Sequence, residues 1–469
     1  MSLSRETRLW PKRAVDRTSK PLLMGCWLST LAGLAGCVAH STAPDYGAVQ
    51  SLVRERTQLE LEPRSSPSPG NVDPAARTLL AEPLSVDNAV RIALLNNRDL
   101  RADLLGLGVA RGQLVQASLF PNLDFEAQVR FSQDPGPGPQ WDFGAGIDIT
   151  KIILNGKRRG VAEAELEAAR FRAAGATLDL GYRVRLAYYQ VQELTGQLEL
   201  RKTAEQVLAA GSEAAQALHD AGNLTELDRS VEQAAAESAH LAVAEAEADL
   251  VEGREQLNVL LGLYAGDTAW SVEPHLPHPA AHLGDLARIE SRAIQASVEL
   301  AEMRATLNAA ARRAGLTEAS GWLPELNVEV HAEHDGAYWE LGPALTGKLP
   351  LFDRQQGDVL SQQAELSALR ERYVAQAVAI RAAIRAARAR ALSALARAER
   401  YRNVLLPLRE RVVKQTLLEY NAMQVGVFQL LQARHDQIDT GSAYVSVLLE
   451  YWQARARLEQ LLAGRMAVE

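Results

Sequence analysis

The chain has 469 residues, of which 47% are hydrophobic and only 5% aromatic, and its formal net charge is −8 at pH 7. This composition predicts a core of Ala, Leu and Val between closely spaced helices rather than a bulky globular interior. The negative charge argues against a nucleic-acid partner. The sequence contains no zinc signature, nucleotide-binding fingerprint or Ser-His-Asp phrase, so it gives no support to an enzyme, a cofactor or a metal site.

The first 36 residues have the pattern of an export signal. Six basic residues precede an apolar stretch, Leu22 to Leu34, that is too short to span a bilayer. Removing residues 1–36 takes away six basic and two acidic side chains, which changes the formal charge from −8 to −12. Cys37 is then the only cysteine left, so no intramolecular disulfide is expected.

The phrase Leu34-Ala35-Gly36-Cys37 resembles the lipobox of bacterial lipoproteins, in which the cysteine is freed by cleavage and acylated. The resemblance implies lipidation of Cys37; the alternative is a structural cysteine that happens to follow small residues. Residues 37–83, which include a Ser- and Pro-rich run at 65–69, are expected to be mainly a tether from the lipid to the folded body.

The rest of the chain repeats one order of predicted structural elements, first in residues 84–283 and again in residues 284–469. Each half has an amphipathic helix, a break at a proline, two short strands, a very long helix, a turn and a return helix. The matching anchors are Leu100 and Leu300, Pro121 and Pro324, and Asp228 and Gln429. Two copies of one supersecondary unit predict a pseudo-symmetric structural body rather than a catalytic cleft.

The helices are predicted from their periodicity and their caps. The first begins after Ser85, a good N-cap residue, and is expected to run to about Ser118. Each long helix would extend roughly 90 Å at 1.5 Å per residue. Two half-length helices stacked end to end would pair with one long helix in coiled-coil-like packing around a tube. The remaining predicted helices are 161–221 and 358–421, which are long, and 225–262, 284–317 and 427–463, which are short.

Four segments alternate apolar and polar side chains, which is the pattern of a strand with unlike faces. They are residues 121–131, 141–150, 324–333 and 338–349. Alternation alone fits a solvated sheet equally well, but strands of about ten residues with aromatic residues near their ends favour membrane strands with a wet inner face. Four strands cannot close a barrel, whereas three copies would supply twelve. The candidate lumen residues are Asp124, Glu126, Arg130, Asp142, Asp148, Glu329 and His331.

These residues and motifs resemble the TolC-type outer-membrane efflux proteins, in their lipid-anchored branch. The resemblance covers roughly residues 84–464 and rests on the duplication and on phrases found in register. The phrases are Ala93-Leu-Leu-Asn-Asn-Arg-Asp-Leu100, Phe120-Pro-Asn-Leu123, Trp322-Leu-Pro-Glu-Leu326, Leu349-Pro-Leu-Phe-Asp353, His219-Asp-Ala-Gly222 and Tyr420-Asn-Ala-Met423. This sequence departs from the family at Arg98, where Pro is usual, and at Met423, where Gly is usual.

What the resemblance implies is a mainly α fold with a membrane β-barrel portion: a homotrimer whose twelve-stranded barrel in the outer membrane continues as a long α-helical tunnel through the periplasm. Its tip would dock on a periplasmic adaptor protein and an inner-membrane pump. The expected function is a passive exit duct for heavy-metal ions or drugs, because the pump would select the cargo. Gly156-Lys157-Arg158 resembles the start of the long helix in heavy-metal efflux relatives.

The turns between long and return helices are the candidate docking site, because an exposed turn at the end of the tunnel is a surface that a partner on the same axis can contact. Gly222-Asn223 and Gln424-Val425-Gly426 are expected to supply the positive φ angles that the turns need. The docking candidates are Gly222, Asn223, Leu224, Met423, Gln424, Val425 and Gly426. The resemblance also implies a constriction near Asp228, with Gln429, Gln432 and Asp436 as further candidates; the competing interpretation of Asp228 is a solvated helix residue.

The residues His331, Glu333 and His334 lie near a hairpin turn and are interpreted as lumen or loop residues rather than metal ligands. A type I secretion duct is an alternative function within the same family. A periplasmic lipoprotein adaptor without a channel is disfavoured, because an adaptor needs no alternating strands of membrane length and the sequence has no lipoyl-like motif.

Overall fold

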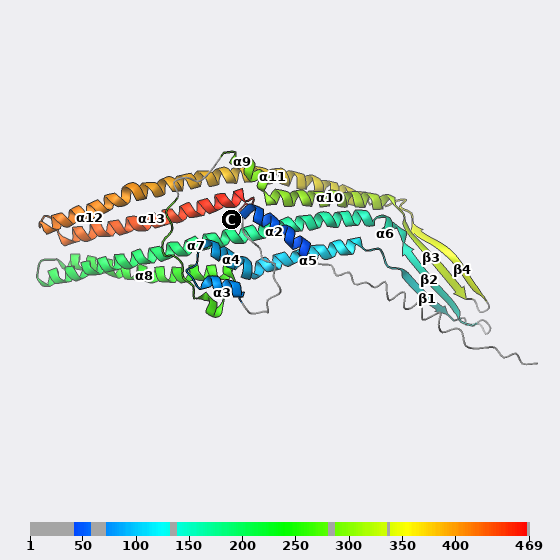
Figure 1. Cartoon of the computed structure of the whole chain (residues 1–469), viewed down its shortest axis with the longest axis horizontal. Coiled ribbons are helices and arrows are strands. Elements are labelled where there is room, and N and C mark those ends of the chain that lie inside the picture. The colour runs from blue at the N-terminus through cyan, green and yellow to red at the C-terminus, as the bar shows by residue number, and fades with distance from the viewer. Residues whose placement is uncertain (1–41, 58–71, 132–137, 280–286, 335–337, 467–469) are drawn as a thin grey trace, which may run out of the picture. The chain divides into compact units, whose positions relative to one another are not determined.

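The computed structural model describes residues 42–57, 72–131, 138–279, 287–334 and 338–466 (Figure 1). Its helices run lengthwise beside one another, and a four-stranded sheet lies at the end opposite the two hairpin turns. Within these ranges, every helix is too short or too polar to qualify as a membrane span.

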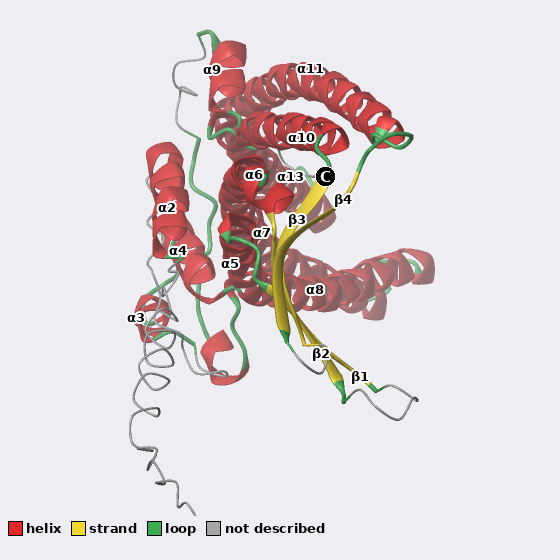
Figure 2. Ribbon diagram, turned by 90° about the vertical axis from the view of Figure 1, so that its right-hand side faces the viewer, coloured by secondary structure: helices red, strands yellow, loops and turns green. Residues whose placement is uncertain are grey.

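The central helix of the first half is α7, Asn155–Asp220, which has 66 residues. It contacts the return helix α8, Glu226–Leu261, and along its other half α5, Arg98–Ser118, and α10, Val298–Trp322. Figure 2 shows these helices clustered side by side, with the sheet extending away from them. Since α7 also contacts the return helix of the second half, it is one of the elements that join the two halves.

The first predicted helix, residues 85–118, is two helices in the structure. α4, Val86–Asn96, ends at Asn97, and α5 begins directly after it. The side chain of Asn97 accepts a hydrogen bond from the backbone N–H of Leu100 at 2.9 Å and donates one to the Leu260 carbonyl at 3.0 Å. The prediction of one continuous helix was wrong because an asparagine side chain here replaces the helix backbone as hydrogen-bond partner.

The corresponding helix of the second half, predicted at 284–317, is broken in the same way. α9, Ile289–Ala296, is separated from α10 by Ser297, whose hydroxyl accepts from the Leu300 N–H at 3.1 Å. Gly262 and Gly464 lie against these two breaks, each with positive φ. A Cβ on Gly262 would lie 2.8 Å from the Asn96 carbonyl oxygen, so this approach requires glycine.

The long helix of the second half is interrupted. α11, Gln356–Arg400, passes through a π-helical turn, Tyr401–Leu405, into α12, Leu406–Asn421. Pro407 lies in the first turn of α12, where its missing N–H donor disrupts the regular helix ladder. The return helix α13 is Val427–Leu462.

Part of the segment expected to be mainly a tether is helical. α2, Ala43–Thr57, and α3, Pro74–Leu80, lie within residues 37–83. On α2, Val49 and Val53 are buried in a cluster that includes Leu107 of α5 and Leu178 of α7. At least this stretch is therefore docked on the helices.

The carboxylate of Asp45 fixes the position of α2. It is fully buried and accepts hydrogen bonds from Arg111 of α5 at 2.7 and 2.9 Å, and from Arg170 of α7 at 2.6 and 3.1 Å. Burial alone would disfavour the charged form, but the hydrogen bonds and charges of the two arginines outweigh it, so the pKa of Asp45 lies below its usual range.

The largest core cluster lies where α4, α7, α8 and α13 meet. Tyr188 of α7 is buried there and donates a hydrogen bond to the Leu84 carbonyl at 2.7 Å. Burial raises the pKa of Tyr188 to about 12, so it remains a neutral hydrogen-bond donor.

The sheet is antiparallel throughout, in the order β1-β2-β3-β4. The strands are β1, Asp124–Arg130, and β2, Gln140–Asp148, from the first half, and β3, Glu325–His334, and β4, Trp339–Lys348, from the second. β1 has 7 residues and is shorter than the predicted segment 121–131, because Pro121 and the residues around it connect α5 to the sheet. The two halves of the chain thus meet between β2 and β3.

Candidate functional site

The register of the strands separates the sheet into two chemically different faces. Residues directly opposite one another in an antiparallel pair lie on the same face. Asp142 of β2 lies opposite Gln128 of β1 and Glu333 of β3, and the same relation continues along the strands. All seven lumen candidates therefore share one face: Asp124, Glu126, Arg130, Asp142, Asp148, Glu329 and His331.

The opposite face of the sheet is apolar and exposed. Phe125 of β1 is 73% exposed and Leu341 of β4 is 75% exposed. Val129, Val328 and Val330 on this face are also exposed. A continuous exposed apolar face of this kind requires an apolar environment or a partner.

Charged side chains on the polar face contact one another across the strands. Arg130 pairs with Glu333 at 2.8 Å. The ring of His331 lies between two carboxylates, with Nε2 2.9 Å from Glu329 and Nδ1 3.7 Å from Asp142. Within the described residues, no group of three or more His, Cys, Asp or Glu side chains has a geometry that could hold a metal ion.

The first hairpin turn joins α7 to α8. Gly222 has φ +76°, as expected, but Asn223 does not have a positive φ, so that part of the expectation was wrong. The Asn223 N–H donates to the Leu218 carbonyl at 2.8 Å, which closes the end of α7. Thr225 is the N-cap of α8 and accepts from the Asp228 N–H at 3.1 Å. Gly222, Asn223 and Thr225 are exposed, so this turn is open to a partner.

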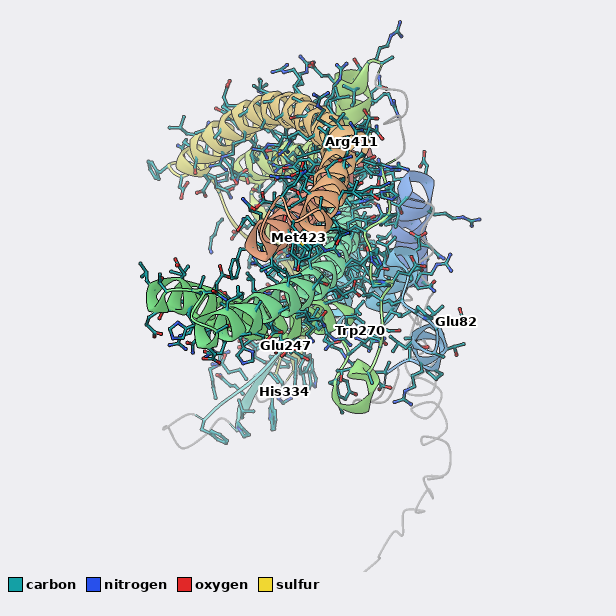
Figure 3. All side chains as sticks on the ribbon, turned by 90° about the vertical axis from the view of Figure 1, so that its left-hand side faces the viewer. Glu82, Glu247, Trp270, His334, Arg411 and Met423 are labelled. Carbon is teal, nitrogen blue, oxygen red and sulfur yellow. The ribbon has the colours of Figure 1, made fainter. Side chains whose placement is uncertain are left out.

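The second hairpin turn, between α12 and α13, is built differently from the prediction. The residue with positive φ is Met423, at +60°, whereas Gly426 is the N-cap of α13 with φ −81°. The expectation that Gln424-Val425-Gly426 supply the positive φ was therefore wrong. Ala422 is the C-cap of α12, and the positive φ falls on the next residue, Met423. Met423 is 94% exposed and lies at the end of the molecule that faces the viewer in Figure 3.

The four constriction candidates lie on the return helices next to these turns. Asp228 is exposed and accepts a hydrogen bond from the Thr225 hydroxyl at 2.7 Å. The side chain of Gln429 accepts from the Gly426 N–H at 2.8 Å. Gln432 donates to Asp436 at 2.7 Å, and Asp436 pairs with Arg409 of α12 at 3.0 Å. Two of the four candidates thus take part in capping a helix, which is a structural role that the sequence analysis did not assign to them.

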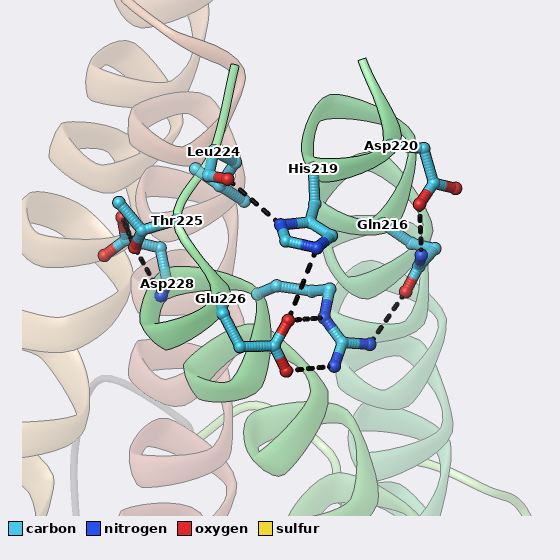
Figure 4. A network of polar contacts seen from close by, with 8 residues as sticks. Gln216, His219, Asp220, Leu224, Thr225, Glu226 and Asp228 are labelled. Carbon is cyan, nitrogen blue, oxygen red and sulfur yellow. Dashed lines mark hydrogen bonds and ion pairs between the residues drawn. The ribbon is translucent and has the colours of Figure 1, made fainter. Parts of the chain in front are cut away.

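A polar network beside the first turn was missed by the sequence analysis (Figure 4). The two ring nitrogens of His219 face the Leu224 carbonyl at 3.0 Å and the Glu226 carboxylate at 3.4 Å. Glu226 also pairs with Arg229, whose hydrogen bonds hold the pKa of Glu226 below its usual range. The spacing of Glu226 and Arg229 on one helix was a signal for that pair. The contact with His219 crosses the turn and has no local signal.

A second missed network joins the two halves midway along α7. Glu193 is buried and accepts from Gln197 at 3.0 Å, and Gln197 donates to the Ser442 carbonyl and the Ser446 hydroxyl of α13 at 3.0 and 3.1 Å. Burial raises the pKa of Glu193, and the hydrogen bonds from Gln197 and Ser446 offset this only in part. The predicted lipidation site, Cys37, lies outside the described residues.

Comparisons with known proteins agree with this architecture. Residues 89–263 match the sequence profile of a family described as outer membrane efflux protein. The cobalt-zinc-cadmium resistance protein CzcC of Cupriavidus metallidurans is 24% identical over 394 residues, which cover 81% of this chain and 90% of CzcC. The probable outer membrane lipoprotein SilC of Salmonella typhimurium is 26% identical over 250 residues, which cover 50% of this chain and 52% of SilC.

The fold is also that of a solved channel. The structure of the CmeC outer membrane channel of Campylobacter jejuni aligns with a TM-score of 0.70 at 15% identity, covering 87% of this chain and 95% of CmeC. The helical scaffold and the four-stranded sheet therefore have the fold of this solved outer membrane channel. The similarity to outer membrane efflux proteins thus comes from a family match over residues 89–263 and from CzcC over 81% of the chain.

Proposed function

We propose that this chain is one protomer of the exit duct of a tripartite efflux system. The observation that carries the proposal is the sheet, whose exposed apolar face suits lipid and whose charged face suits water. The duct has no energy source of its own and conducts what an inner-membrane pump delivers.

The protomer closes its duct by pooling strands with two further copies. β1 and β4 are the two edges of the described sheet, and pairing β4 of one protomer with β1 of the next would give a twelve-stranded barrel in a homotrimer. The long helices continue this barrel as a periplasmic tunnel. The glycines at corresponding breaks, Gly262 and Gly464, support the division into repeats at 84–283 and 284–469.

The two hairpin turns are the surface for a periplasmic adaptor protein. They lie at the end opposite the sheet, and the backbone of both is closed by its own hydrogen bonds, so the side chains are free to contact a partner. The docking residues are Gly222, Asn223 and Leu224 on the first turn, and Met423, Gln424, Val425 and Gly426 on the second. The lumen residues named above line the barrel, and a lipid on Cys37 anchors the N-terminal segment, residues 37–83, to the outer membrane.

The cargo is a divalent transition-metal ion. CzcC, whose name records resistance to cobalt, zinc and cadmium, aligns along most of its length with this chain, and this supports metal export over drug export. A protein cargo, as in type I secretion, has no such support.

The test is a deletion strain complemented with the intact gene. Loss of the gene should sensitise cells to cobalt, zinc or cadmium, with little effect on dyes and antibiotics, and the purified protein should conduct in planar bilayers and migrate as a trimer on unheated gels. A purified protein without conductance would favour the adaptor interpretation. If the deletion strain were sensitive to drugs instead of metals, the proposal of a metal cargo would be rejected and the proposal of an exit duct would stand.

A further inference from the structure

The helices next to the sheet follow the same order as its strands. α5 contacts α7, α7 contacts α10, and α10 contacts α11. Along the chain, α5 precedes β1, α7 follows β2, α10 precedes β3, and α11 follows β4. Among the described elements, α5 and α11 are therefore at the two edges of this helical layer, as β1 and β4 are at the edges of the sheet. In a closed ring of identical copies, each edge meets the opposite edge of the next copy.

A pocket of about 560 Å³, the Trp322 pocket, lies at the α11 edge where the helices meet the sheet. Its walls come from the end of α10, the connection after β4 and the first turns of α11. Trp322, Leu351 and Leu360 line it and are 65%, 65% and 68% exposed. The guanidinium of Arg354 stacks over the ring of Trp322, with Cζ 4.7 Å from the ring centroid. The other lining residues are Glu318, Gln356, Val359 and Gln363.

The walls of the Trp322 pocket are held together by the protomer itself. A Cβ at position 321 would overlap the Arg354 carbonyl oxygen, so the close approach of the connection to α10 requires Gly321. On the α11 side, the Gln362 side chain donates a hydrogen bond to the Thr317 hydroxyl of α10 at 2.8 Å. The pocket is therefore already formed in a single copy, with its apolar side chains left exposed.

The contact between the two halves of the chain provides an internal template for a contact between copies. Pro324, the counterpart of Pro121, lies just before β3, beside the residues that follow β2. There the Thr150 hydroxyl donates to the Pro324 carbonyl at 2.6 Å and accepts from the Leu326 N–H at 2.9 Å. This contact arises because β2 and β3 are antiparallel, which puts the start of β3 beside the end of β2. Pairing of β4 with β1 of the next copy would put the start of β1 beside the end of β4 in the same way.

The segment just before β1 carries exposed apolar side chains. Phe120 is 69% exposed and Leu119 is 52% exposed. Phe120 lies four residues before the first residue of β1, and Leu351 lies three residues after the last residue of β4. Antiparallel pairing between copies therefore brings Phe120 of one copy to the level of the Trp322 pocket of the other.

We propose that Phe120 of each protomer inserts into the Trp322 pocket of the next protomer. The Phe120 ring packs on Trp322, Leu351 and Leu360, and so removes from water the apolar surface that a single copy leaves exposed. The contact is heterologous, because the inserted ring and the pocket lie on opposite edges, and three such contacts close a ring. The inference rests on the proposed function, since it requires pairing of β4 with β1 in a homotrimer.

The first experiment joins the two positions by a disulfide in the full-length protein. Phe120→Cys combined with Leu351→Cys, oxidised in outer-membrane fractions, should give covalent dimers and trimers on denaturing gels, and a reductant should remove them. Neither single variant should do so, because a heterologous contact does not bring a residue against its own copy. Phe131→Cys with Leu351→Cys is the matched control, since Phe131 is 80% exposed but follows the opposite end of β1.

The second experiment measures energetic coupling between the two rings. Phe120→Ala should accelerate dissociation of the trimer in detergent about tenfold, the effect expected for one buried aromatic anchor. Trp322→Ala should have a similar effect, and the double variant should not exceed the larger single effect, because both rings act in one contact. Phe131→Ala combined with Trp322→Ala should instead give the product of the two separate effects.

The outcomes separate this inference from the proposed duct. Trimers that migrate normally on unheated gels but show no crosslink between positions 120 and 351 would overturn the inference and leave the duct intact. Independent effects of Phe120→Ala and Trp322→Ala would also overturn it. A lipid is the competing occupant of the pocket, and destabilisation by Trp322→Ala without any effect of Phe120→Ala would indicate it. A wild-type protein that neither forms trimers nor conducts would reject the proposed function, and the inference with it.

Discussion

At the scale of single residues, Asp45 has the clearest energetic role. Its buried carboxylate is held by two arginines from two different helices, so removing its charge leaves both guanidinium groups without their partner. Both arginines keep contact with solvent, which moderates the cost.

Asp45→Asn should therefore destabilise the docked α2 at pH 7, by about 1–3 kcal/mol. Because the folded pKa of Asp45 is lowered, its stabilisation is present above the ordinary Asp value of 3.8 and is lost as the pH falls through the folded pKa. Limited proteolysis of the segment after Thr57, at pH 7 and at pH 3, measures this. The exposed Glu82→Gln is the control, and a difference between Asp45→Asn and wild type that does not shrink at low pH would contradict the ion-pair explanation.

Asp228 has two possible roles that substitution can separate. Asp228→Asn keeps an oxygen that can accept from the Thr225 hydroxyl but removes the charge, whereas Asp228→Ala removes both. If three copies of Asp228 line a constriction, both variants should alter single-channel conductance or block by divalent cations, with trimer yield unchanged. An effect of Asp228→Ala that Asp228→Asn does not reproduce would assign Asp228 to helix capping, and the constriction would then be sought at Gln429, Gln432 and Asp436.

At the scale of elements, β1 provides a matched pair of positions on the two faces of the sheet. Val129 lies opposite Trp141 on the apolar face, and Gln128 lies opposite Asp142 on the charged face. Val129→Arg should impair assembly in the membrane, because an arginine facing lipid near the bilayer centre costs about 2–4 kcal/mol. Gln128→Arg should be tolerated, since the new charge faces water and a carboxylate.

The measurement is the yield of heat-modifiable trimer in outer-membrane fractions. Similar yields for the two variants would indicate a solvated sheet rather than membrane strands.

At the scale of the whole molecule, the attachment to the outer membrane combines strands and a lipid. The proposed barrel uses four strands from each protomer, whereas acylation of Cys37 adds only acyl chains. Cys37→Ser should abolish incorporation of labelled fatty acid but leave part of the trimer in the outer membrane. Complete loss of the protein from outer-membrane fractions would show that the lipid, rather than the strands, governs localisation.

The sequence alone determined the features that depend on local periodicity. The apolar and charged faces of the strands follow from alternation with period two, and α7 and α8 follow from helical spacing up to the turn at Gly222. These patterns repeat over many residues, so a single exception does not hide them.

Only the tertiary structure decided the features that depend on contacts between distant residues. The break at Asn97 depends on the Leu260 carbonyl, and the docking of α2 depends on Arg111 and Arg170 meeting at Asp45. The positive φ at Met423 depends on where α12 ends, which no glycine in the sequence indicated. In each case the local backbone conformation depends on contacts or on a helix end that lie outside the local sequence pattern. Such features do not repeat with the period of a helix or a strand, so periodicity in the sequence cannot reveal them.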